Sequence, residues 1–155
     1  MIEQRYFELQ SYAIFAAMLG IAGLPIYIHA PKFFVDTYGV SLSALGLALF
    51  FLRLVDFVQD PLLGKLAEST RKYRVAPVWI AGLVMALGMF GLFAMPSPIS
   101  PVLWFCLTLS AVFSGFSFLS IRFYAQGVSS FGAPGQLRLA RWRETGSLLG
   151  ICLAA

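Results

Sequence analysis

Four polar side chains, two of them carboxylates, lie inside one apolar run of the sequence, residues 41–67. They are Arg53, Asp56, Gln59 and Asp60. Because successive residues of an α-helix turn by about 100°, these positions fall within about 120° of one another, on one side of a helix. Charges in hydrocarbon are costly, so charges that share one face of such a helix indicate a functional site.

The spacing of the two aspartates suits cation binding. Asp56 and Asp60 stand four residues apart, so their carboxylates can converge on one point. Sodium takes oxygen ligands, which carboxylates, amides and hydroxyls supply, whereas a proton needs only one of the two carboxylates. The structural alternative is a network in which Arg53 neutralises Asp56 and Asp60 caps a neighbouring helix. Beyond such a sodium ion or proton, we expect no metal and no cofactor.

A second polar line runs through the apolar segment 101–126. Its members are Ser110, Ser114, Ser117, Ser120 and Tyr124. They can line a cavity, but serine is also a common packing residue between membrane helices, and both readings stay open. Arg122 falls about 200° from Ser120 on a helix and is expected to extend to the cytoplasmic interface.

Composition identifies the class of protein around these residues. Of the 155 residues, 59% are hydrophobic and 12% are charged, whereas soluble domains have about 25% charged residues. The apolar segments are continuous and long enough to cross a bilayer, which predicts an all-α integral membrane protein. The sequence contains no nucleotide loop, metal cluster or nucleophile triad, so we expect neither an enzyme nor a nucleic-acid partner.

About five transmembrane helices are expected in one domain, 1–155. They cover about 11–31, 41–67, 75–95, 101–126 and 137–155, with a bend at Pro25 and a loop over 127–136. Basic residues gather on one side of the membrane: Arg5, Lys65, Arg71, Lys72, Arg74, Arg138 and Arg141, against Lys32 on the other. The positive-inside rule therefore predicts a cytoplasmic N-terminus. A bacterial inner membrane is the expected location.

The last expected helix is short of apolar residues. The apolar stretch from Thr145 to Ala155 has eleven residues, or about 16 Å of helix against a hydrocarbon core of about 30 Å. The chain also stops there without a polar cap. We therefore expect an incomplete bundle that a C-terminal half or a partner subunit completes.

Three stretches resemble a known family. They are FFVDTYGVSLSALG, LRLVDFVQDPLLGKLAESTRKYR with its D-x-x-x-D-P-x-x-G core, and RWRETGSLLG. All three resemble the glycoside–pentoside–hexuronide:cation symporters of the major facilitator superfamily. The resemblance covers the chain as the first five of the family's twelve helices, and so implies an N-terminal half of that fold.

The resemblance also implies a cation site and a cytoplasmic loop. The cation site would comprise Asp56, Asp60, Gln59 and a hydroxyl that aligns to Ser117, where the family has Asn and Thr at the last two positions. A charge network and loop would comprise Arg53, Gly64, Glu68 and Arg71, and the loop latches the closed state in that superfamily.

The solute cavity departs from the family pattern. Arg143 aligns with an arginine that faces the sugar cavity, and Tyr124 corresponds to an aromatic that stacks on sugar. Gly20 and Ser120 stand where the family has its sugar-binding carboxylates. The resemblance therefore implies a cation-coupled solute, such as a sugar or glycoside, rather than one named sugar.

Two functions from different classes follow. The first is cation-coupled secondary transport of a small solute by alternating access in a lipid bilayer, driven by sodium or protons. The alternative is a truncated transporter-like subunit with a structural or assembly role in a larger membrane complex. A third function, translocation of a lipid by a relative of this family, is not distinguished from solute transport by the sequence.

Overall fold

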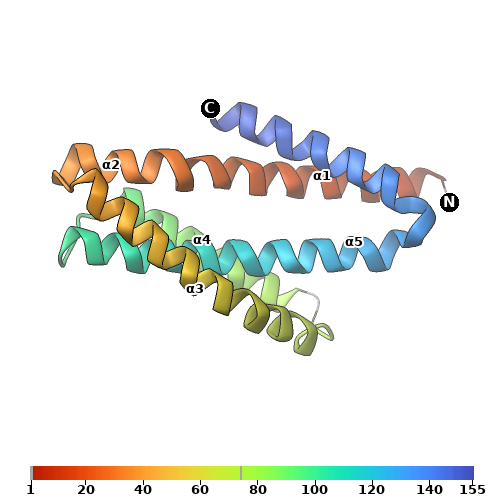
Figure 1. Cartoon of the computed structure of the whole chain (residues 1–155). Helices are drawn as coiled ribbons and strands as arrows, with labels where there is room; N and C mark the ends of the chain where they lie inside the picture. The colour runs from red at the N-terminus through yellow and green to blue at the C-terminus, as the bar shows by residue number, and fades with distance from the viewer. Residues whose placement is uncertain (1, 74) are drawn as a thin grey trace. The chain divides into compact units, whose positions relative to one another are not determined.

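The computed structural model describes residues 2–73 and 75–155, which are almost entirely helical (Figure 1). Its elements are α1 (Ile2–Leu24), the π-helical turn η1 (Pro25–His29), α2 (Ala30–Tyr38), α3 (Leu42–Ser69), α4 (Ala76–Phe93) and α5 (Pro101–Ala154). Four described stretches are long and apolar enough to cross a membrane: Glu8–Tyr38, Leu42–Ser69, Ala76–Phe93 and Pro101–Gly132. The predicted all-α membrane class is confirmed.

The first helical stretch is longer than expected. At Pro25 the backbone forms one π-helical turn and continues, so the helical path runs on through α2 to Tyr38. A π turn absorbs a residue that the α pattern cannot accommodate and deflects the helix without ending it. Gly39 then ends α2 with φ 64°, and Ser41 begins α3 by accepting a hydrogen bond from the Ala44 amide at 3.3 Å.

The expected loop over 127–136 is replaced by helix. Residues on both sides of Gly132 are helical, and Gly132 alone leaves the helical conformation, with φ 56° and ψ −177°. A backbone of this kind suits glycine, which has no Cβ to clash. The other glycines and the serines of this segment are helical, and the ribbon of α5 reverses its direction near its end (Figure 1).

The segment after Gly132 differs from the four apolar stretches. It is helical to Ala154, but it begins with a cluster of charges: Arg138, Arg141, Arg143 and Glu144. This cluster lowers the apolarity of the segment. Among the described residues, the candidate spans therefore number four, and the predicted helix 137–155 is not one of them.

The chain divides into two compact units. The first comprises residues up to Ile28 together with Phe123–Ala155. Within it, α1 and the last part of α5 pack backbone against backbone. Gly146 lies directly against Ala13 and Gly150 against Ala17. Small residues spaced four apart permit this close approach in membrane helices.

The second unit, His29–Arg122, contains α2, α3, α4 and the first part of α5. Small residues again allow close packing, because a Cβ on Gly115 would lie 2.7 Å from the Ala81 carbonyl oxygen. The rings of Phe34 on α2 and Phe105 on α5 meet edge to face, with 5.0 Å between their centroids, and both are fully buried. This unit holds the polar residues of α3.

Candidate functional site

The polar face of α3 begins with an ion pair. The Arg53 guanidinium lies 3.2 Å from the Asp56 carboxylate, and only 14% of the Asp56 side chain is exposed. The guanidinium also lies 4.9 Å above the ring of Phe113 on α5. Arg53 therefore supplies the counter-charge of Asp56, as the structural reading of the sequence anticipated.

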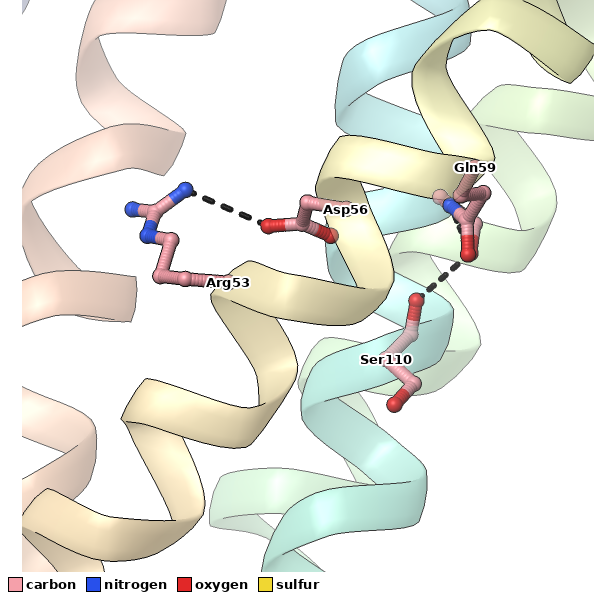
Figure 2. A network of polar contacts seen from close by, with 5 residues as sticks. Arg53, Asp56, Gln59 and Ser110 are labelled. Atoms are coloured by element: carbon pink, nitrogen blue, oxygen red, sulfur yellow. Dashed lines mark hydrogen bonds and ion pairs between the residues drawn. The ribbon is translucent and has the colours of Figure 1, made fainter.

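Gln59 points toward α5 and joins a second set of polar contacts. Its side-chain amide donates to the Ser114 hydroxyl at 2.8 Å, and that hydroxyl donates to the Ser110 carbonyl at 2.7 Å. Figure 2 shows the Arg53–Asp56 pair on one side of α3 and Gln59 directed to the helix that carries Ser110. The contact uses the amide NH₂ of Gln59 and not its carbonyl oxygen.

The two remaining residues of the expected cation site are placed differently. Asp60 is exposed on α3, and in the described part of the chain it takes part in no ion pair. Ser117 is half-buried on α5, and Gln59 bonds to Ser114, three residues earlier. Ser114 is the hydroxyl that the structure brings to Gln59.

The polar residues of α3 therefore make separate contacts: the Asp56 carboxylate pairs with Arg53, whereas the Gln59 amide bonds to Ser114. Within the described residues no three His, Cys, Asp or Glu side chains gather as a metal site.

Two residues of the expected solute cavity come together in the first unit. The Arg143 guanidinium lies 4.6 Å over the ring of Tyr124. The same guanidinium makes two hydrogen bonds to the Glu144 carboxylate, at 3.0 and 2.7 Å. The planar Arg143 guanidinium, stacked on the half-exposed Tyr124 ring, forms a flat surface, and the N–H donors lie at the edge of the guanidinium.

Gly20, the other solute residue of this unit, lies in a helix contact. A Cβ at this position would lie 2.6 Å from the backbone oxygen of Ser147, so no side chain fits. An acidic side chain at this position would clash with the backbone of α5. Ser120 is half-buried in the second unit.

The residues of the expected cytoplasmic loop lie in the last turns of α3 and just after it. Glu68 and Arg71 form an exposed ion pair at 3.5 Å, and such pairs contribute little to stability. Gly64 is half-buried within α3. Arg74 and the side chain of Arg5 lie outside the described residues.

Arg122 holds this loop, and the sequence analysis missed its role. Its guanidinium donates to the carbonyl of Ala67, in the last turn of α3, and to that of Tyr73, each at 3.0 Å. The last carbonyls of a helix have no partner within the helix, and a cation there is favourable. A lone arginine in an apolar segment is the signal; the sequence predicts that it extends to the cytoplasmic interface, but not that it bonds to the end of a neighbouring helix.

Comparison with known proteins gives one match. No curated protein and no solved structure matches the chain. The family model described as MFS/sugar transport protein matches residues 9–155. This match covers nearly the whole chain and agrees with its apolar helices. The chain therefore belongs to the MFS/sugar transport protein family, whose members are membrane transporters of sugar-type solutes and not enzymes.

Proposed function

We propose that this chain forms the cation-coupling bundle of a secondary transporter that carries a sugar or glycoside together with sodium or a proton. The proposal places the protein with the glycoside–pentoside–hexuronide:cation symporters inside the wider family. The observation that carries it is the half-buried carboxylate of Asp56 in the middle of α3. Next to it on the same helix are Gln59 and Asp60, which supply further oxygen ligands.

A carboxylate in this position needs a positive partner. In the present arrangement Arg53 supplies it at 3.2 Å, and a bound cation would supply it instead. The Arg53 guanidinium is half-exposed and stands at the end of a long, flexible side chain. When a cation replaces it beside Asp56, the guanidinium can therefore move into solvent, and no unpaired charge is left buried. The bundle would then have two states, one with Arg53 and one with the cation beside Asp56. In both states the Asp56 carboxylate has a positive partner.

The solute would bind where aromatic and guanidinium groups are presented together. Tyr124 and Arg143 form such a pair, and sugars bind through stacking on rings and hydrogen bonds from their hydroxyls. Gly20 has no room for an acidic side chain, which supports a solute recognised by this pair rather than by a helix-one carboxylate. The cation and the solute would be linked because each favours the same conformation of the bundle.

Alternating access requires a second bundle that moves against this one. The proposal therefore includes a C-terminal half or a partner subunit, in a lipid bilayer. Many large apolar side chains are exposed on the described helices, among them Phe57, Trp79 and Leu83. Faces of this kind suit contact with lipid or with further membrane helices.

The test is accumulation of labelled solutes by proteoliposomes that contain the full-length protein. A panel of radiolabelled hexoses, pentoses and glycosides is offered under an inward sodium gradient, an inward proton gradient or neither. We expect one gradient to drive at least one solute above its equilibrium level. Equilibration at the same rate and to the same level under all three conditions would contradict cation coupling and leave only facilitated diffusion.

A further inference from the structure

An apolar groove lies between α3, α4 and α5 of the second unit. Its volume is about 540 Å³. Its walls come from one side of each helix and include Leu63, Leu66, Ile80, Val84 and Phe118. This groove does not contain the Arg53–Asp56 pair.

The polar side chains in the walls offer little to a sugar. The Thr70 hydroxyl donates to the Leu66 carbonyl at 2.6 Å. The Ser114 hydroxyl donates to Ser110 and accepts from Gln59. These two hydroxyls are thus occupied within the protein, and apart from Tyr73 the other wall side chains are apolar. An apolar occupant therefore fits the groove better than a hydroxylated one.

The length of the groove matches one leaflet of a membrane. Along α4 it extends from Ala76 to Val84, which is about 12 Å of helix. Half of a bilayer's hydrocarbon core is about 15 Å thick. One end of the groove lies at the loop after α3, which the positive-inside rule places at the cytoplasmic surface.

A positive charge lies at this end. Tyr73 forms part of the groove wall, and the Lys72 ammonium lies 4.9 Å over its ring. Arg71 is exposed beside it. The hydrogen bond from Arg122 to the Tyr73 carbonyl fixes the loop in place, so that the positive charge stays at the mouth of the groove.

We propose that this groove binds an anionic glycerophospholipid of the cytoplasmic leaflet, with one acyl chain between α3 and α4 and its phosphate at Lys72. Charge complementarity and the match to one leaflet support this occupant. Basic pockets between membrane helices on the cytoplasmic side bind such headgroups in general. The groove shares Ser114 with the proposed cation site but does not include the Arg53–Asp56 pair or the Tyr124–Arg143 pair. Its test measures lipid retention rather than transport, so its failure is distinguishable from failure of the proposed function.

The experiment is native mass spectrometry of the full-length protein in detergent, titrated with dioleoyl phosphatidylglycerol or dioleoyl phosphatidylcholine. Two variants address the site: Lys72→Gln removes the charge, and Ala76→Phe fills the mouth of the groove. Each has a matched control, Lys65→Gln on the same side of the membrane and Ala86→Phe on the same helix. All four positions are exposed, and the two controls do not line the groove.

We expect the wild-type protein to retain one phosphatidylglycerol more tightly than phosphatidylcholine. Lys72→Gln should weaken the first phosphatidylglycerol about fivefold, the effect of one basic residue near a membrane surface. Ala76→Phe should weaken both lipids, and both controls should bind as wild type does. Circular dichroism on each variant verifies that the helices remain.

Several results would overturn the proposal. Equal retention of the two lipids by the wild-type protein would exclude headgroup recognition. An equal loss in Lys65→Gln and Lys72→Gln would show general surface charge rather than a site. Unchanged binding in Ala76→Phe would place the acyl chain elsewhere, and no retained lipid at all would show that the groove is not a phospholipid site.

Discussion

The side-chain amide of Gln59 donates a hydrogen bond to the hydroxyl of Ser114, with 2.8 Å between nitrogen and oxygen. This bond joins the middle of α3 to the first part of α5 inside one compact unit. It also selects one serine from the polar line of α5. The resemblance to known symporters points to Ser117 for the hydroxyl near the cation, whereas the hydrogen bond of Gln59 goes to Ser114, three residues earlier.

The first prediction separates these two serines. Ser114→Ala removes the acceptor of the Gln59 amide in a part-buried position, which should destabilise the protein by about 1 kcal/mol. It should also weaken cation binding, because the Gln59 side chain is no longer held. Thermal unfolding and cation titration of the full-length protein measure both effects.

Ser117→Ala is the matched control for this substitution. It removes the same hydroxyl from the same helix and should leave stability close to that of the wild type. A larger loss of cation affinity in Ser117→Ala than in Ser114→Ala would show that the family register, and not the observed hydrogen bond, identifies the ligand.

The second prediction concerns close packing in the first unit. In Gly20→Ala the new Cβ would lie 2.6 Å from the Ser147 backbone oxygen, and backbone cannot move aside easily. We expect a loss of about 1–3 kcal/mol in the free energy of unfolding. Gly23→Ala is the control, since nothing lies within 4 Å of its Cβ and alanine favours the helix. Equal shifts in melting temperature for both variants would argue against this helix contact.

The third prediction concerns Arg122. Arg122→Leu removes two hydrogen bonds of 3.0 Å that hold the end of α3 and the following loop. We expect a loss of about 2 kcal/mol, in the range for hydrogen bonds from charged groups. Amide hydrogen exchange should accelerate in this loop and not elsewhere. Arg141→Leu, at an exposed position on α5, should leave amide exchange in this loop unchanged. A similar acceleration of loop exchange in Arg141→Leu would contradict a specific role for Arg122.

Much of the fold can be predicted from the sequence because membrane helices are long, apolar and locally hydrogen-bonded. The polar face of α3 could be located for the same reason, since Arg53 and Asp56 belong to one helix and their spacing fixes their contact. Contacts between helices are different. Whether Gln59 meets Ser114 or Ser117 depends on how α5 is rotated against α3, which no local pattern encodes.

The segment around Gly132 shows a second limit of prediction. Its glycines, serines and proline are typical of loops, yet the residues on either side are helical. A backbone near hydrocarbon gains from internal hydrogen bonds, which outweighs the weak preference of these residues for turns. The role of Arg122 was missed for a related reason, because its partners are backbone carbonyls some 50 residues away in the chain.

The central claim is that Asp56 couples a cation to solute movement, and its most direct test is gradient-driven accumulation by variants of the full-length protein in proteoliposomes. Asp56→Asn keeps the size of the side chain but removes its charge, and Asp60→Asn does the same one turn away. The control is Asp36→Asn, which alters an exposed carboxylate paired with Lys32 at 2.9 Å. We predict that Asp56→Asn and Asp60→Asn abolish accumulation under the coupling gradient while Asp36→Asn retains it. Accumulation by Asp56→Asn at the wild-type level would contradict the account.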